Sequence, residues 1–317
     1  MTWIVVVADR IAEAGLSVLR DAPGVELRSA VGDAAALRKL LPEAHALLVR
    51  SDTQVTGELI GLAPALRVIG RAGVGVDNID VATATRRGIA VLNAPGANTV
   101  SAAEHTLGLL LALVRRIPWA AQSMRAGAWD RKTFAGVELR GKTLGIVGLG
   151  RIGAHVATVA RALGMKLCAH DPFLSEQRAR ELGVELLPLD DLLAQADAVT
   201  LHLPLTAETR HLLDTVRIGR MKRGALLVNT ARGELVDEAA LLAALTDGQL
   251  AGAALDVFAR EPLPADSPLR SSDRLLLTPH LAASTKEAQD RAALEICQAV
   301  LAALAQGEPL PADVVRR

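Results

Sequence analysis

The chain has 317 residues, half of them hydrophobic, which is enough for one very large domain or two ordinary ones with a sizeable buried core. Lysine and arginine together number 35, as do aspartate and glutamate, so the formal net charge is zero. A balanced charge provides no electrostatic basis for binding nucleic acid or an acidic membrane surface, and we expect neither partner.

The first ten residues contain an apolar run that stops too soon for a signal peptide and has no basic segment before it. We interpret this run as a buried strand. The longest apolar stretch elsewhere, 106–114, is too short to cross a membrane. Cys168 and Cys297 lack the spacing of a metal site or a disulfide framework, so we expect two buried free thiols and no metal. Together these features predict a cytoplasmic protein.

Short β-branched runs alternate with alanine- and leucine-rich runs of helical period through most of the chain. The predicted strands are 4–7, 46–49, 68–69, 90–92, 143–147, 166–169, 198–201, 226–228, 252–255 and 275–277. Continuously apolar strands separated by helices are typical of parallel sheets covered on both faces. The sequence therefore predicts an α/β fold with doubly wound parallel sheets.

Two long helices interrupt this alternation. The first is expected at about 101–126, and Pro118 within it should kink or split the helix. The polar segment 127–134 follows without a clear period, and a second long helix is predicted at about 284–306. These helices flank a central block and predict a discontinuous arrangement. The expected domains are 98–282 for one, and 1–97 with 283–317 for the other.

A glycine-rich turn follows the predicted strand 143–147. Glycines stand at 148, 150 and 153 in a G-x-G-x-x-G pattern, and a helix is expected over 154–163. Gly148 permits the tight turn, Gly150 allows close approach of a pyrophosphate, and Gly153 allows the helix to pack on the strand. The helix N-terminus offers N–H groups and a partial positive charge to the phosphates. The pattern predicts a Rossmann-type dinucleotide site.

Asp171 ends the next predicted strand, eighteen positions after Gly153. A carboxylate there can accept hydrogen bonds from both ribose hydroxyls and repels a 2′-phosphate, which favours NAD over NADP. The alternative interpretation is a glycine turn that serves only packing, with Asp171 as a helix cap ahead of Pro172.

Three polar residues follow later strands, at the sheet edge where doubly wound proteins bind ligands. They are Arg232, Glu261 and His280. Oxidising a secondary alcohol requires a group that takes the hydroxyl proton, and a histidine suits this role near neutral pH. A carboxylate beside it would favour the protonated ring and fix its tautomer, and an arginine can hold a substrate carboxylate. Each residue also has a structural alternative, as a surface arginine, a loop cap or a hydrogen-bonded histidine after Pro279.

At these residues the sequence resembles the D-isomer-specific 2-hydroxyacid dehydrogenase family of NAD-dependent oxidoreductases. The resemblance spans nearly the whole chain and is carried by segments 70–80, 143–171, 202–206, 229–238, 254–262 and 279–285. It implies a Rossmann NAD domain inserted into a discontinuous, flavodoxin-like substrate domain. It also implies a dimer arm at 129–134, with Arg131 and Lys132 near the neighbouring active site of a homodimer.

The resemblance assigns roles residue by residue. His280 is implied to be the general acid and base, Glu261 its support, and Arg232 the ligand of the substrate carboxylate. The substrate-binding residues it implies are Arg50, Arg71, Val74, Gly75 and Asn98, with the two arginines facing a substrate phosphate. The cofactor-lining residues it implies are Gly148, Gly150, Arg151, Ile152, Gly153, Asp171, Thr230, Ala231, Asp256 and Ala282.

Within the family, segments 49–51, 98–104 and 283–288 resemble members that oxidise D-3-phosphoglycerate to 3-phosphohydroxypyruvate in serine biosynthesis. Ala282 stands where many relatives have glycine, and Leu203 replaces a threonine of some relatives. Because the sequence ends at Arg317, we expect no serine-sensing C-terminal domain. Two alternatives stay open: a glyoxylate or hydroxypyruvate reductase on the same scaffold, and a non-catalytic NADH-sensing binding protein.

Overall fold

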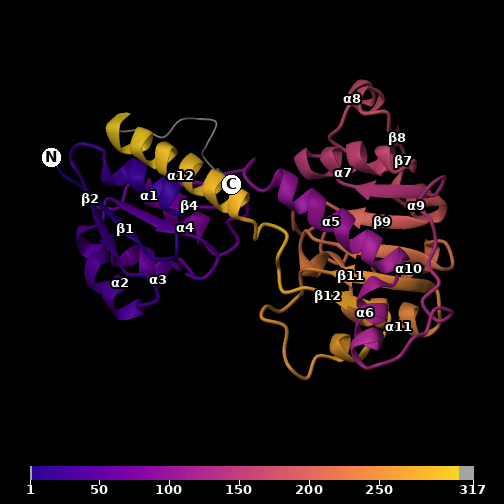
Figure 1. Ribbon diagram of the computed structural model, residues 1–317. Helices are drawn as coiled ribbons and strands as arrows, with labels where there is room; N and C mark the ends of the chain where they lie inside the picture. Colours follow the sequence, from indigo (N-terminus) through magenta and orange to yellow (C-terminus); the bar gives the residue numbers. More distant parts are fainter. Residues whose placement is uncertain (1, 307–317) are drawn as a thin grey trace. The chain divides into compact units, whose positions relative to one another are not determined.

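The computed structural model describes residues 2–306. The chain divides into two compact units, which we call unit 1 (Met1–Asn98 and Ala283–Arg317) and unit 2 (Thr99–Ala282). Each unit contains one sheet, and all the pairs between named strands are parallel (Figure 1). The predicted α/β class with doubly wound parallel sheets is confirmed.

Unit 1 is built on a five-stranded sheet in the order β2-β1-β3-β4-β5. Its strands are β1 (Trp3–Val7), β2 (Val25–Ser29), β3 (Ala46–Val49), β4 (Val68–Arg71) and β5 (Ala90–Leu92). Its helices are α1 (Glu13–Arg20), α2 (Ala34–Leu40), α3 (Gly57–Gly61), α4 (Val81–Arg86) and α12 (Lys286–Gln306), with a 3-10 turn η1 (Leu41–Glu43).

The C-terminal helix α12 completes the core of unit 1. It lies beside α1 (Figure 1), where a Cβ on Gly15 would come within 2.4 Å of the Ala293 carbonyl oxygen. Ile296, Cys297 and Val300 on this helix are fully buried against the sheet. The segment that follows unit 2 in the sequence is therefore needed to cover one face of the unit 1 sheet.

Unit 2 is built on a seven-stranded sheet in the order β12-β11-β10-β9-β6-β7-β8. Its strands are β6 (Thr143–Val147), β7 (Lys166–His170), β8 (Glu185–Leu186), β9 (Ala198–Leu201), β10 (Ala225–Asn229), β11 (Leu250–Leu255) and β12 (Leu275–Leu277). Its helices are α5 (Thr99–Val114), α6 (Ile117–Arg125), α7 (Arg151–Ala162), α8 (Glu176–Glu181), α9 (Leu189–Gln195), α10 (Thr215–Arg220) and α11 (Glu238–Thr246), with 3-10 turns η2 (Gly233–Leu235) and η3 (Pro268–Ser271).

The two faces of this sheet carry separate hydrophobic clusters. Helices α5 and α7 pack on one face, and α9, α10 and α11 pack on the other. The strand order reverses at β6, which has β9 on one side and β7 on the other. Such a reversal leaves a crevice at the carboxyl ends of the strands, where doubly wound folds bind ligands. The glycine turn that follows β6 lies at this point.

All ten predicted strands form, with ends that differ by at most two residues. The two strands that the sequence did not predict are β2 and β8, and both are edge strands. Strand β2 has the sequence VELRS, with no fully buried residue, and β8 has only two residues. An edge strand with polar side chains lacks the apolar signal on which the prediction rests.

The predicted break near Pro118 is also confirmed. Helix α5 ends at Val114, Arg116 adopts a left-handed backbone with φ of 53°, and Pro118 lies in the first turn of α6. Proline fits this position because the first turn needs no N–H donor. None of the described helices is long and apolar enough to cross a membrane.

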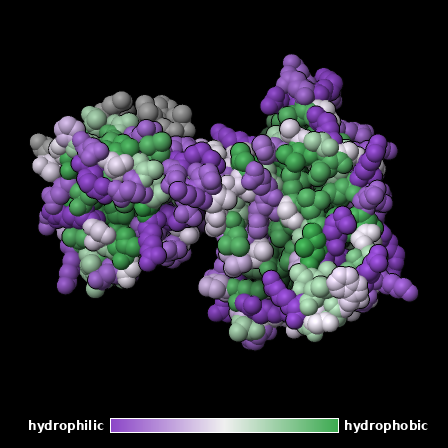
Figure 2. Space-filling view, in the orientation of Figure 1, coloured by the Kyte–Doolittle hydropathy of each residue, from purple (hydrophilic) through white to green (hydrophobic). Residues whose placement is uncertain are grey.

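The two cysteines are buried free thiols, as predicted. Burial raises the pKa of Cys168 to about 11 and that of Cys297 to about 12, so neither forms a thiolate near neutral pH. On the surface of unit 2, apolar side chains gather over the face along which α5 runs, and polar side chains surround them (Figure 2).

Candidate active site

The glycine turn after β6 has the geometry that a bound pyrophosphate requires. Gly148 has φ of 89°, and a Cβ there would lie 2.7 Å from the His202 carbonyl oxygen. A Cβ on Gly153 would lie 2.1 Å from the Gly148 carbonyl oxygen, so only glycine lets α7 pack this closely. A Cβ on Gly150 would meet no atom of the described residues within 4 Å. The turn therefore leaves open space at Gly150, at the start of α7, and fits a dinucleotide phosphate.

Asp171 follows β7 and contacts this turn directly. Its Oδ2 accepts a hydrogen bond from the Leu149 N–H at 2.9 Å, and its Oδ1 accepts one from the Phe173 N–H at 3.0 Å. The interpretation of Asp171 as a helix cap is wrong, because the N-cap of α8 is Ser175. The Asp171 carboxylate thus anchors the glycine turn. It also lies where a carboxylate that binds the ribose hydroxyls is expected.

Glu261 and His280 form a close pair. Glu261 Oε2 lies 2.7 Å from His280 Nδ1, and Glu261 Oε1 accepts a hydrogen bond from the Phe258 N–H at 3.0 Å. Burial would raise the pKa of Glu261, but the hydrogen bonds from His280 and Phe258 hold it below its ordinary value. Because an ionised carboxylate only accepts hydrogen bonds, Nδ1 carries the hydrogen and Nε2 is left for substrate.

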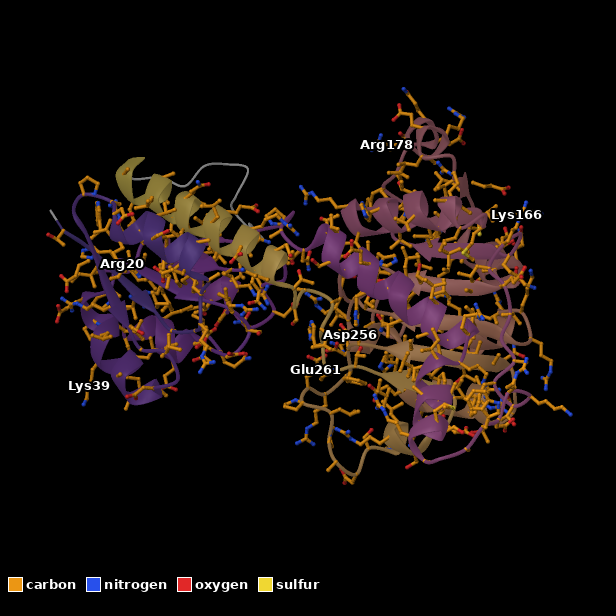
Figure 3. The ribbon with its side chains drawn as sticks, in the orientation of Figure 1. Arg20, Lys39, Lys166, Arg178, Asp256 and Glu261 are labelled. Carbon is orange, nitrogen blue, oxygen red and sulfur yellow. The ribbon has the colours of Figure 1, made fainter. Side chains whose placement is uncertain are left out.

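Asp256 holds the backbone around His280. The His280 N–H donates to the Asp256 carbonyl oxygen at 2.8 Å, and the Leu281 and Ala282 N–H groups donate to the two carboxylate oxygens, each at 2.8 Å. Thr278 Oγ1 donates to Oδ1 at 2.6 Å. Three consecutive N–H groups therefore point at one residue and fix His280 in a left-handed conformation with φ of 54°. Figure 3 shows Asp256 near Glu261, between the end of β11 and the loop that follows.

Asp256 is surrounded by hydrogen-bond donors from the protein itself. The resemblance implies that this residue lines the cofactor, and in unit 2 its side chain is fully buried. Burial would raise the pKa of Asp256, and the hydrogen bonds from His105, Thr278, Leu281 and Ala282 together bring it below its ordinary value. These contacts fix the loop that carries His280, so we describe Asp256 as a positioning residue, and a contact with the cofactor stays a prediction for it.

Arg232 is held by the end of β10. The fully buried Asn229 accepts a hydrogen bond from the Ala231 N–H at 3.0 Å and donates one to the Arg232 carbonyl oxygen at 2.8 Å. A Cβ on the next residue, Gly233, would lie 1.9 Å from the carbonyl carbon of Phe258. The Arg232 loop therefore packs directly against the loop that carries Glu261. Sequence reasoning did not single out Asn229, although it ends an apolar strand, close to where the other site residues lie.

The remaining predicted cofactor residues lie at the same edge of unit 2. Thr230 Oγ1 is 2.7 Å from Thr106 Oγ1, and because the Thr106 hydroxyl already donates to the Ala102 carbonyl oxygen, Thr230 is the donor between them. Ala282 is 95% buried beside Asp256. Arg151 and Ile152 form the first residues of α7, and the arginine is exposed.

The predicted substrate residues lie in unit 1 and are described by themselves. Arg50 follows β3, whose last residue, Val49, pairs with Arg71 on β4. Arg50 is held by its backbone: its N–H donates to Asp9 Oδ2 at 2.6 Å, and its carbonyl oxygen accepts from Asn78 at 2.8 Å. Within unit 1 the carboxyl ends of these strands thus bring the two arginines to neighbouring positions.

The segment 73–75 follows β4 in the same unit. Asn93 Nδ2 donates to the Val74 carbonyl oxygen at 2.6 Å, and the Ala94 N–H donates to the Gly73 carbonyl oxygen at 2.8 Å. These contacts hold the backbone on which Val74 and Gly75 lie. Asn98 is the last residue of this part of unit 1, immediately before α5 begins. Asp9, Asn78 and Asn93 were not singled out from the sequence, because single polar residues after a strand are common in loops.

The fold and the glycine turn define a dinucleotide-binding α/β protein. Residues 107–282 match the family model of the D-isomer specific 2-hydroxyacid dehydrogenase, NAD binding domain. The chain belongs to this family. The cofactor predicted from Asp171 and the glycine turn, NAD, agrees with the family domain.

Similar proteins give more detail. A D-3-phosphoglycerate dehydrogenase of Mycobacterium bovis is 51% identical over 309 residues, which are 97% of this chain and 58% of that protein. The chain thus spans little more than half the length of this relative. An NAD-dependent formate dehydrogenase of Staphylococcus aureus, solved with NAD, has 33% identity and a TM-score of 0.86 over 100% of this chain and 99% of that one. A glyoxylate reductase of Paecilomyes thermophila has 32% identity and a TM-score of 0.87 over 98% and 97%.

Proposed function

We propose that this chain catalyses the NAD-dependent oxidation of D-3-phosphoglycerate to 3-phosphohydroxypyruvate, a step of serine biosynthesis, in the cytoplasm. The observation that carries the proposal is the contact of 2.7 Å between His280 Nδ1 and Glu261 Oε2, next to the Arg232 loop and at the same sheet edge as the glycine turn. The likeness to a D-3-phosphoglycerate dehydrogenase at 51% identity supports the choice of substrate.

In the proposed reaction each residue of the site has one task. His280 Nε2 takes the proton of the substrate hydroxyl, and Glu261 stabilises the resulting imidazolium through Nδ1. Arg232 binds the substrate carboxylate through two hydrogen bonds and places the hydroxyl near His280. The nicotinamide cofactor, when bound, supplies the acceptor for the hydride. Asp171 favours NAD because its negative charge repels a 2′-phosphate.

The residues of unit 1 complete the proposal for the substrate. The Val74 and Gly75 N–H groups bind the carboxylate, Asn98 contributes to substrate binding, and Arg50 and Arg71 bind the phosphate. Arginine suits this task because its guanidinium pairs with phosphate through two parallel hydrogen bonds.

We also propose that the chain forms a homodimer. Four large apolar side chains on α6 and the segment after it are more than half exposed: Ile117 by 54%, Met124 by 51%, Trp129 by 79% and Val137 by 54%. Apolar side chains gathered on one face of a unit (Figure 2) are typical of a protein interface. The segment that carries Arg131 and Lys132 would then reach the partner subunit, as expected of the dimer arm that the resemblance implies.

The second candidate is reduction of glyoxylate or hydroxypyruvate. The structural likeness to a glyoxylate reductase, with a TM-score of 0.87, favours it, since the same acid and base chemistry serves both substrates. The two candidates differ in the phosphate, which only the first requires.

Steady-state kinetics on the purified chain separates these candidates. We expect turnover of D-3-phosphoglycerate with NAD, and kcat/KM at least about tenfold lower for D-glycerate, which lacks only the phosphate, since a lost hydrogen bond to a charged group costs about 1.5–3 kcal/mol. Arg50→Gln should lower kcat/KM for D-3-phosphoglycerate and leave that for D-glycerate within about threefold. Turnover of hydroxypyruvate with none of D-3-phosphoglycerate would refute the first candidate in favour of the second.

A further inference from the structure

His105 lies in the middle of α5 and contacts the residue that positions His280. Its Nε2 is 3.2 Å from Asp256 Oδ1 and 3.2 Å from Thr278 Oγ1. The His105 side chain is 22% exposed, whereas that of Asp256 is fully buried. His105 and Asp256 are 151 positions apart in the sequence, so their contact is made by the tertiary structure and not by the helix itself.

The hydrogen bonds determine which nitrogen of His105 carries the hydrogen. Asp256 receives hydrogen bonds from Thr278, Leu281 and Ala282, as expected of an ionised carboxylate, which only accepts them. The single hydrogen of the Thr278 hydroxyl is used on Asp256 at 2.6 Å, so this oxygen also accepts. Both neighbours of His105 Nε2 are therefore acceptors, and Nε2 must be the donor.

We propose that His105 is a positioning residue of the active site, which donates from Nε2 to the Asp256–Thr278 pair and thereby holds the loop that carries His280. The proposal rests on the proposed function, because that function gives the orientation of His280 its meaning. Removing one donor from a buried carboxylate weakens its hold on the Leu281 and Ala282 N–H groups, since the carboxylate then reorganises or takes up water.

The neighbouring residue on α5 supports this role for the helix. Thr106 accepts a hydrogen bond from Thr230, which precedes the Arg232 loop, while His105 donates to the residues around the His280 loop. Two adjacent side chains of one helix thus contact both loops that carry proposed catalytic residues. Because a helix is rigid over this length, it can fix the distance between the two loops.

Two matched variants test the proposal. In His105→Gln the amide nitrogen reaches about as far from the backbone as Nε2 does, whereas in His105→Asn it reaches only as far as Nδ1. The first keeps the donor at the contact and the second removes it. His105→Leu, which has a high helix propensity, replaces the asparagine variant if that variant does not fold.

The first measurement needs no substrate. Hydrogen exchange at the Leu281 and Ala282 amides of the full chain, followed without ligand, should be about tenfold faster or more in His105→Asn than in wild type, and near wild type in His105→Gln. The second measurement is kinetic. We expect kcat for the 2-hydroxy acid to fall by about 10- to 100-fold in His105→Asn, with NADH affinity within about threefold, and to recover in His105→Gln.

Equal behaviour of the glutamine and asparagine variants in both measurements would overturn the proposal, as would a loss of kcat in His105→Asn with unchanged exchange at both amides. If the wild-type chain turns over no 2-hydroxy acid, the proposed function fails by itself. In that case unchanged exchange in His105→Asn refutes the positioning role, and faster exchange supports it.

Discussion

At the scale of single residues, the site depends on carboxylates that use both oxygens. Glu261 binds the Phe258 N–H with one oxygen and His280 with the other, so its orientation and that of the imidazole are fixed together. Asp171 accepts from two segments of backbone, at Leu149 and Phe173, and the two oxygens of Asp256 accept from the adjacent Leu281 and Ala282 N–H groups. Because both oxygens of each carboxylate are used, a residue that was expected to bind the cofactor also holds the backbone of a neighbouring loop.

A prediction at this scale concerns the His280 pair. We expect His280→Ala to lower kcat by about 10² to 10⁴, the usual contribution of general acid–base catalysis. Glu261→Gln should lower kcat less, because the amide oxygen still accepts from one of the two donors while the amide nitrogen repels the other. Steady-state kinetics measures both, and NADH titration followed by fluorescence serves as the control. An equal loss of NADH affinity in His280→Ala would contradict the assignment and indicate a structural histidine.

At the scale of elements, strands and loops are connected by side chains that cross between them. Asp171, at the end of β7, binds the turn between β6 and α7. His105 and Thr106 connect α5 to the ends of β11, β12 and β10. Gly233 lets the loops after β10 and β11 touch. The site is therefore formed by the contacts between loops, which the secondary structure alone does not determine.

The second prediction tests Asp171 at this scale. Asp171→Ala removes the carboxylate that is expected to bind the ribose hydroxyls, and with it the anchor of the glycine turn. NADH affinity should therefore fall by about tenfold or more. Asp171→Asn loses the charge and one of the two acceptors but keeps one oxygen that accepts a hydrogen bond, so its affinity should fall less. In both variants the preference for NAD over NADP should decrease, because no negative charge remains to repel the 2′-phosphate. Titration with NADH and NADPH checks this. An unchanged preference would rule out that Asp171 binds the ribose hydroxyls.

At the scale of the whole molecule, each unit has its own core and sheet, and unit 1 requires α12 to close its core. In unit 2 several carboxylates have lowered pKa values. For Asp197, burial would raise the pKa, but hydrogen bonds from the Thr143 N–H and Lys222 lower it below its ordinary value. Asp256 and Glu261 behave similarly. A carboxyl whose pKa is lower when folded stabilises the fold above its unfolded pKa, about 4, and this contribution is lost as the pH falls through the folded value.

The third prediction follows from this sign. Asp197 Oδ2 accepts from the Thr143 N–H at 2.8 Å, and Oδ1 lies 3.1 Å from Lys222 Nζ, so the carboxylate connects the start of β6 to the residues before β10. Because the side chain is about a third exposed, we expect Asp197→Asn to lower the free energy of unfolding by about 1–2 kcal/mol at pH 7. Urea unfolding should show this difference shrinking as the pH falls below about 4. A difference that is the same at pH 7 and pH 3 would contradict the role of the charge.

Much of this protein follows from local sequence. The ten predicted strands, the break at Pro118, the glycine turn with Asp171 and the residues Arg232, Glu261 and His280 each carry a signal within a short segment. Apolar runs, proline and glycine act on the backbone nearby, so their effects can be predicted without knowing the fold.

Other features depended on the tertiary structure. The polar edge strands β2 and β8 form because a neighbouring strand offers hydrogen bonds, and their own side chains give no such signal. The contact of His105 with Asp256 joins residues 151 positions apart, and the fully buried Asp256 holds the backbone that follows His280. The sequence by itself determined the class of fold and the family of the chain, because both rest on residue types in local patterns. Only the tertiary structure decided which side chains hold the site in place, because burial and hydrogen-bond partners are set by segments that are distant in the chain.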